Sequence, residues 1–197
     1  MEAARGRTGE TVPADYFRRL YRKDADPWGF ASSEYERSKY RATLAALPRL
    51  RYTSGLELGC SIGVFTAMLA RRCASLRAVD CSPEAVRAAQ LRCSSLAHVW
   101  VEECDLAKSF PRGRYDLVTI CEIGYYFAPR DLARICDDIA AVLAQAGDLV
   151  LVHWTPPVEG HAQTADDVHA TFINDERFAV AVSRRTQQYR LDVLSKK

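Results

Sequence analysis

The sequence lacks the close cysteine pairs that zinc knuckles and dithiol redox motifs require. Its seven cysteines are odd in number and scattered, which also argues against a disulfide framework. We therefore expect no metal site and reduced thiols, most of them buried as small core side chains. The cysteines are Cys60, Cys73, Cys81, Cys93, Cys104, Cys121 and Cys136.

Long apolar runs are also missing, since no stretch approaches the ~20 apolar residues of a membrane span. The N-terminus is rich in Arg and Gly and has no apolar segment, so it does not resemble a secretory signal. These absences predict a cytoplasmic protein with no membrane partner.

Charge of one sign is not in excess, because 27 Lys and Arg stand against 25 Asp and Glu. Contacts with phosphate backbones usually need a basic stripe, so we expect a small-molecule partner and no nucleic acid. At 197 residues the chain is long enough for one buried core. We predict a mobile tail at 1–10 and a single domain at 11–197, as a monomer or homodimer.

Helical spacing of aromatic residues predicts a first helix over 13–22, and Ser33 or Ser32 can cap a second that runs to about Leu47. These N-terminal helices, 13–47, are expected to form a lid. Apolar strands and helical segments alternate after them, which is typical of a parallel sheet covered on both faces. The expected strands are 56–58, 76–79, 99–101, 115–120 and 149–152; the expected later helices begin after the turn at 59–63, at 82 and at 131.

The end of the chain departs from this alternation. Two strand-like runs, 178–183 and 188–194, are separated only by a short turn at Arg184-Arg185, which requires an antiparallel pair. The predicted fold is therefore α/β, with a Rossmann-like, mainly parallel seven-stranded sheet, helices on both faces and an antiparallel terminal strand.

The segment Leu56-Glu57-Leu58-Gly59-Cys60-Ser61-Ile62-Gly63 leads from a strand through a glycine turn into a helix. Glycines at such a turn let the backbone approach a ligand closely. The dinucleotide pattern G-x-G-x-x-G is absent, because Ser61 replaces its second glycine and Val64 its third. This difference weighs against a nicotinamide oxidoreductase.

Asp80 ends the next predicted strand, 23 residues after Glu57. A carboxylate in this position can accept hydrogen bonds from both hydroxyls of an adenosyl ribose. The alternative is an ordinary tight turn followed by a helix cap. The glycine turn and the acid together favour a nucleoside-binding site.

These residues resemble the class I S-adenosylmethionine-dependent methyltransferases. Glu57-x-Gly59-x-Ser61-x-Gly63 is similar to their motif I, with serine at a position that is usually glycine, and Asp80 is similar to their ribose-binding acid. Asp105-Leu106 resembles their adenine-contacting pair, and Tyr115-Asp116-Leu117-Val118 resembles their fourth-strand motif.

A narrower resemblance is to the nodulation S-type N-methyltransferases, which act on the exposed amine of a deacetylated chitooligosaccharide. It rests on Asp26-Pro27-Trp28, on Tyr35-Glu36-Arg37 and on Glu122-Ile123-Gly124-Tyr125-Tyr126. The resemblance implies S-adenosyl-L-methionine as cofactor and an amine, such as a deacetylated amino sugar, as acceptor. A small-molecule O-methyltransferase and a non-catalytic S-adenosylmethionine-binding protein are the alternatives.

The resemblance also implies a set of cofactor-binding residues. Arg37 is the candidate for the methionine carboxylate, because a guanidinium matches a carboxylate in two places, although it could equally be a surface charge. Trp28 belongs either to the lid or to the anchor of its loop. The full expected set is Trp28, Arg37, Glu57, Gly59, Cys60, Ser61, Gly63, Asp80, Cys81, Asp105, Leu106 and Glu122.

The expected catalytic residues are His153, Tyr125 and Glu122. Methyl transfer needs no metal, but an amine acceptor must lose its proton, and a histidine titrates in the right range to receive it. His153 is the candidate, the alternative being a strand-end histidine bonded to backbone. Tyr125 could face the sulfonium or pack in the core, and Glu122 could attract an ammonium or cap a helix.

Overall fold

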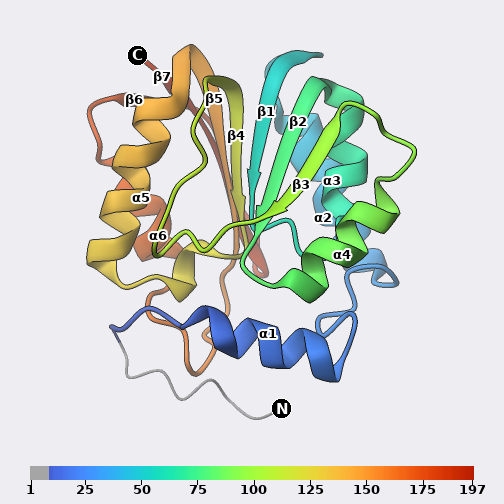
Figure 1. Ribbon diagram of the computed structural model, residues 1–197. Helices are drawn as coiled ribbons and strands as arrows, with labels where there is room; N and C mark the ends of the chain where they lie inside the picture. The colour runs from blue at the N-terminus through green and yellow to red at the C-terminus, as the bar shows by residue number, and fades with distance from the viewer. Residues whose placement is uncertain (1–8) are drawn as a thin grey trace.

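The computed structural model describes residues 9–197, which form a single seven-stranded sheet in the order β3-β2-β1-β4-β5-β7-β6. Figure 1 shows this sheet between two layers of helices. Strands β1 to β5 are mutually parallel, and their carboxyl ends meet at one edge, where Leu58 pairs with Val79 and Ile120. The strands are β1 (Tyr52–Leu58), β2 (Cys73–Asp80), β3 (Val99–Glu103), β4 (Tyr115–Cys121), β5 (Leu143–Trp154), β6 (Phe178–Arg185) and β7 (Tyr189–Lys196).

The predicted fold class is confirmed. Strand β7 alone runs against the others, because it pairs antiparallel with both β5 and β6. The expected turn at Arg184-Arg185 is wrong, since both residues belong to β6 and residues 186–188 make the connection. Thr186 closes this turn by accepting at its hydroxyl from the backbone N–H of Tyr189 and of Gln188.

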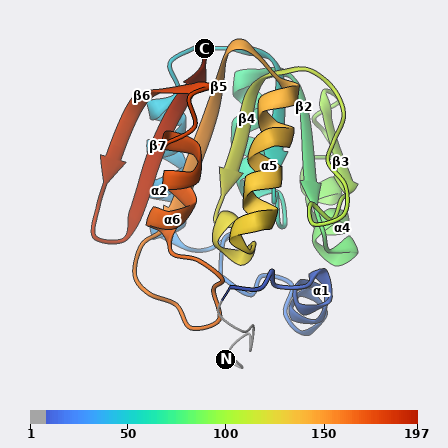
Figure 2. The same ribbon diagram turned by 90° about the vertical axis from the view of Figure 1, so that its left-hand side faces the viewer.

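Helices cover both faces of the sheet, as Figure 2 shows for α5 and α6 on one side. Their apolar residues Ile135, Ile139 and Phe172 pack on the inner strands with Leu56 and Val118. The opposite face is covered by α2 and α3. The helices are α1 (Ala14–Lys23), α2 (Glu34–Ala46), α3 (Val64–Leu69), α4 (Pro83–Arg92), α5 (Pro129–Val142) and α6 (Ala165–Ile173), with 3-10 turns at Ala70–Arg72 and Gly124–Tyr126.

Helix α1 lies crosswise at the edge where the parallel strands end (Figure 1). The second helix begins where the sequence predicts, because the Ser33 hydroxyl accepts from the backbone N–H of Glu36 at 3.2 Å. The predicted mobile tail falls mainly on residues 1–8, outside the described residues. Within residues 9–197, no helix is both long and apolar enough to cross a membrane.

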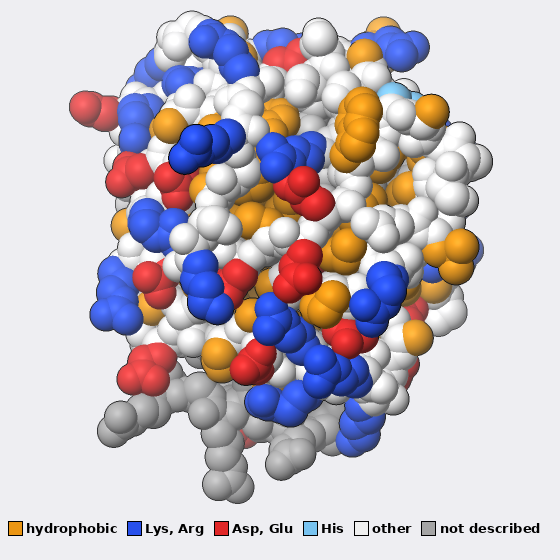
Figure 3. Space-filling model, in the orientation of Figure 1, with side chains coloured by type: hydrophobic (Ala, Val, Ile, Leu, Met, Phe, Trp, Pro, Cys, Tyr) orange, Lys and Arg blue, Asp and Glu red, His pale blue; other side chains and the backbone are white. Residues whose placement is uncertain are grey.

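The surface carries charges of both signs. Figure 3 shows Lys and Arg side chains interspersed with Asp and Glu over the face drawn. Several of them form ion pairs, such as Arg18 with Glu103 at 2.9 Å and Arg134 with Asp138 at 3.0 Å. Exposed pairs of this kind contribute less than about 1 kcal/mol each to stability.

Candidate functional site

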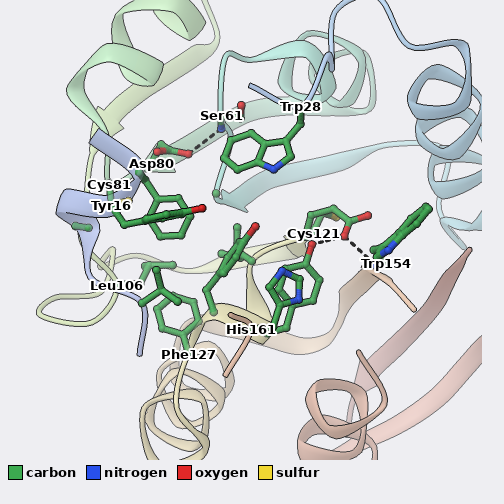
Figure 4. Close-up of a pocket in the computed structure, with 18 of the residues that line it drawn as sticks. Tyr16, Trp28, Ser61, Asp80, Cys81, Leu106, Cys121, Phe127, Trp154 and His161 are labelled. Carbon is green, nitrogen blue, oxygen red and sulfur yellow. Dashed lines mark hydrogen bonds between the residues drawn. The ribbon is translucent and has the colours of Figure 1, made fainter. Parts of the chain in front are cut away.

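A cavity of about 640 Å³ opens at the carboxyl edge of the sheet, beneath α1. This is the edge at which open α/β sheets bind ligands. Its walls come from α1, α2, the turn after β1, the ends of β2 to β4 and the segment between β5 and α6. In Figure 4, Asp80, Cys81 and Leu106 gather on one side of the cavity, and Cys121, Trp154 and His161 on the other.

The turn after β1 is built by backbone conformations that favour glycine. Gly59 and Gly63 both have φ of +79°, and the non-glycine Ser61 lies between them at φ +50°. A Cβ on Gly63 would lie 2.9 Å from the Cα of Ala89, so helix α4 packs directly against the turn. Gly59 and Ser61 line the cavity.

Ser61 occupies the position at which motif I of the class I methyltransferases usually has glycine. Its backbone N–H donates to a carboxylate oxygen of Asp80 at 2.9 Å, and its hydroxyl forms a hydrogen bond with that of Tyr21 on α1 at 2.5 Å. Ser61 therefore adopts a left-handed backbone conformation, which is strained for a non-glycine residue, and its hydroxyl contacts the covering helix α1.

Asp80 ends β2 with its carboxylate held by two backbone donors. Oδ2 accepts from Ser61 N–H at 2.9 Å and Oδ1 accepts from Ser82 N–H at 3.0 Å. Burial raises the pKa of Asp80, while these backbone hydrogen bonds oppose the rise. Each oxygen retains capacity for another donor, so the group fits the two hydroxyls of a ribose.

The wall next to Asp80 is suited to a flat apolar ring. Leu106 is buried and lines the cavity together with Cys81, Asp105 and Phe127. The Asp105 carboxylate accepts from the backbone N–H of Ala107 at 3.1 Å. A purine could stack on the apolar side chains here and donate its amino group to Asp105.

Glu122 stands at the centre of a hydrogen-bond network at the end of β4. It adopts φ +58°, and its Oε2 accepts from the Tyr125 hydroxyl at 2.7 Å and from the Trp154 backbone N–H at 2.8 Å. Its Oε1 forms an ion pair with Lys39 of α2, which also pairs with Glu36 at 3.0 Å. Strained backbone at a ligand-facing position is typical of functional sites.

His153 does not line the cavity, which corrects the expectation that it acts as the base. Its side chain is fully buried; Nε2 accepts from Gly124 N–H at 3.0 Å, and Nδ1 lies 3.0 Å from Nε2 of His169. His169 in turn donates from Nδ1 to Asp192. Both nitrogens of His153 are therefore engaged, and burial holds its pKa well below the ordinary value.

Arg37 also lies away from the cavity, because its guanidinium pairs with Glu34 at 2.8 Å on an exposed face of α2. Residues three apart share a helix face, so Glu36 and Lys39 point together into the cavity and Arg37 does not. The structure therefore does not bring Arg37, the expected partner of the methionine carboxylate, to the cavity. In the described part of the chain, Lys39 is the Lys or Arg residue that lines the cavity.

Three further residues of the expected cofactor set do not line the cavity: Glu57 near the end of β1, and Cys60 and Gly63 in the turn that follows. Glu57 is buried, and its Oε2 has no hydrogen-bond partner among the described residues. Burial raises the pKa of Glu57 to about 7. This carboxyl group therefore supports the turn and titrates near neutrality.

We expect Glu57 to make stability fall as the pH rises from about 4.5 to about 7. The unfolded chain loses this proton near 4.5 while the folded chain keeps it to about 7, so the stabilisation present at low pH is lost across that window. Urea unfolding of wild type and Glu57→Gln at a series of pH values measures it. Across the window, the free energy of unfolding of the variant should rise relative to that of wild type by on the order of 3 kcal/mol, since each pKa unit corresponds to about 1.4 kcal/mol. A constant difference between the two proteins would contradict the expectation, and the comparison cancels contributions from the histidines.

Several cavity residues carry no sequence pattern that marks them as part of a site. His161 lies in a connection without periodicity, so no pattern marks it. Helix α1 contributes an aromatic face to the cavity, and the spacing of these aromatic residues predicts a helix but not which surface the helix covers. Within residues 9–197, no group of three or more His, Cys, Asp or Glu is placed to hold a metal ion. The lining residues outside the expected set of site residues include Tyr16, Phe17, Tyr21, Phe30, Glu36, Lys39 and His161.

Comparison with known proteins agrees with this architecture. The N-methyltransferase NodS from Bradyrhizobium japonicum WM9, solved in complex with S-adenosyl-L-homocysteine, superimposes with a TM-score of 0.82 at 23% identity, covering 93% of this chain and 97% of that one. Nodulation protein S of Bradyrhizobium diazoefficiens is 31% identical over 157 residues, which are 75% of this chain and 73% of that protein. The homologous protein of Rhizobium tropici is 30% identical, and the match spans about half of its length, 53%.

A parallel sheet with one reversed strand, a glycine turn after β1 and a carboxylate at the end of β2 are the features of an S-adenosylmethionine-dependent methyltransferase, and this chain is one. The family model described as nodulation protein S (NodS) matches residues 14–186. The chain belongs to the NodS family.

Proposed function

We propose that this enzyme methylates a primary amine on a small molecule, with a deacetylated amino sugar as the favoured acceptor. The observation that carries the proposal is the charge of the cavity. Among residues 9–197, five carboxylates line it against one ammonium, that of Lys39. Such a surface attracts a cationic amine and a sulfonium and repels an acidic acceptor. The carboxylates are Glu36, Asp80, Asp105, Glu122 and Glu159.

The Asp80 side of the cavity would hold the cofactor. Asp80 would accept from the ribose hydroxyls, Asp105 and Leu106 would contact the adenine, and the turn at Gly59 and Ser61 would lie beside the methionine moiety. Lys39 would take the role expected of Arg37 toward the methionine carboxylate. When bound, the cofactor supplies an activated methyl group on a sulfonium.

The other side of the cavity would hold the acceptor. Aromatic rings line it, and rings of this kind stack on the apolar faces of sugars as well as on cations. The Glu122 network fixes Tyr125 in this wall. Helix α1 and the segment containing Trp28 cover the cavity, so we propose that the N-terminal helices act as its lid and exclude water. The bound acceptor would then lie beside the methyl donor, which is the main requirement of an in-line transfer.

The test is a panel of acceptors with S-adenosyl-L-methionine carrying a tritiated methyl group. We expect turnover on a deacetylated chitooligosaccharide, and at least about 100-fold less on its fully N-acetylated form, because acetylation ties up the nitrogen lone pair. Phenols and carboxylates of similar size serve as controls.

Two results would contradict the proposal. Turnover only on phenols or carboxylates would make the enzyme an O-methyltransferase. Calorimetric binding of S-adenosyl-L-homocysteine without turnover on any member of the panel would leave a cofactor-binding protein that has lost catalysis.

A further inference from the structure

His161 is held beside the cavity by the two residues that follow it. It lies on the segment between β5 and α6, where the N–H groups of Ala162 and Gln163 donate to the carbonyl of Tyr125 at 2.9 and 3.2 Å. The Gln163 side chain donates to the carbonyl of Phe127 at 2.8 Å. Ala162 and Gln163 thus tie this segment to the cavity wall at Tyr125 and Phe127.

The imidazole of His161 is packed between aromatic rings. It stacks on Tyr125 with ring centroids 4.0 Å apart and an interplanar angle of 10°, and it meets Tyr126 edge-on at 5.0 Å. Figure 4 shows the ring on the side of the cavity that also holds Cys121 and Trp154. Neither ring nitrogen has a hydrogen-bond partner in the described part of the chain, so the lone pair of the neutral ring is available to a ligand.

The neighbouring groups are not free to accept a proton. The Tyr125 hydroxyl donates to Glu122, and burial raises the pKa of that phenol strongly. Glu122 already accepts from Tyr125, Lys39 and the Trp154 backbone. His153 is buried with both nitrogens bonded.

We propose that His161 is the catalytic base that deprotonates the acceptor ammonium before methyl transfer. The inference rests on the proposed amine methylation. A ring nitrogen of His161 takes one proton from R–NH₃⁺ and leaves R–NH₂ with a free lone pair. That lone pair forms the new N–C bond as the S–C bond breaks, and the bonding electrons remain on sulfur, giving a neutral thioether and R–NH₂⁺–CH₃. The imidazolium then returns its proton to water when the cavity opens.

The protonation state of His161 suits this role. Burial lowers its pKa, although Glu122 opposes the shift, so the ring is neutral at pH 7. The titratable groups around it are Tyr125, Tyr126, Glu122 and the buried His153, with Lys39 beyond Glu122. Both tyrosines stay protonated at neutral pH because burial raises their pKa values.

The test compares His161→Gln with wild type on a deacetylated chitooligosaccharide between pH 6 and 9.5. Glutamine keeps a planar polar side chain but cannot take up the proton. We expect kcat to fall at least about 100-fold at pH 7, which is the usual contribution of a general base. The deficit should shrink as the pH rises, because more of the acceptor arrives already deprotonated. The affinity for S-adenosyl-L-homocysteine should stay within about threefold of wild type.

His98→Gln is the matched control, since His98 is bonded to the carbonyl of Ala70 at 3.0 Å and does not line the cavity. It should match wild type at every pH. A kcat of His161→Gln within threefold of wild type at pH 7, or a loss of equal size at every pH, would overturn the role of His161. Absence of amine turnover by the wild-type enzyme would instead reject the proposed function itself.

Discussion

Replacing Asp80 with alanine should weaken the binding of S-adenosyl-L-homocysteine at least about 100-fold. A hydrogen bond to a charged group contributes about 1.5–3 kcal/mol, and we expect Asp80 to receive two of them from the ribose. Two such bonds correspond to a factor of about 100 or more in the dissociation constant. The substitution also removes the acceptor for the backbone N–H groups of Ser61 and Ser82, which shape the turn. Isothermal titration calorimetry measures the change.

The chain offers a close control for this experiment in Asp116. Its carboxylate also accepts from two backbone donors, the N–H groups of Thr53 and Ser54, both at 2.8 Å. It lies at the opposite end of the sheet, near the start of β1. Asp116→Ala should therefore lower the free energy of unfolding and leave the affinity for S-adenosyl-L-homocysteine unchanged. An Asp80→Ala protein that binds within about threefold of wild type would show that the carboxylate does not hold the ligand.

Replacing Asp192 with alanine should destabilise the fold by about 3 kcal/mol. Asp192 is fully buried on β7 and accepts from His169 Nδ1 and, at 2.8 Å, from Arg190. Its removal leaves a buried imidazole N–H without an acceptor and breaks the ion pair with Arg190. The donors in this relay all point one way, since Gly124 donates to His153, His153 to His169 and His169 to Asp192. Thermal unfolding should shift down by roughly 10 °C, at about 2–4 °C for each kcal/mol.

Asp166 provides the matched control, because it also pairs with Arg190, at 3.1 Å, but its side chain is half exposed. Exposed pairs contribute less than about 1 kcal/mol, so Asp166→Ala should unfold within a few degrees of wild type. Equal shifts for the two variants would show that the buried relay adds nothing beyond an ordinary surface charge pair.

The sheet was predictable because its strands carry strong local signals. Each central strand is an apolar run next to a turn residue, and the spacing of the last two runs permits only an antiparallel connection. Asp80 was predictable for a related reason, since its place at the end of β2 follows from the strand pattern. Its position beside the glycine turn then follows from the parallel pairing of β1 with β2.

The residues on the acceptor side of the cavity were harder to predict from the sequence. A helix advances 100° for each residue, so an error in helix phase exchanges Lys39 for Arg37. His153 is the next-to-last residue of β5, a strand covered on both faces, where alternation does not tell which layer a side chain enters. The position of His161 depends on hydrogen bonds to Tyr125, 36 residues earlier in the chain, which no local pattern encodes.

The hydrogen bond between Tyr21 and Ser61 connects helix α1, which covers the cavity, to the turn after β1. One partner sits on the covering helix and the other in the turn that we assign to the cofactor. Glycine at position 61 would remove this hydrogen bond and leave the packing of Tyr21 on Ile62. With serine there, α1 cannot lift from the cavity without breaking a bond to the turn, so exchange of spent cofactor and movement of the cover belong to a single opening event.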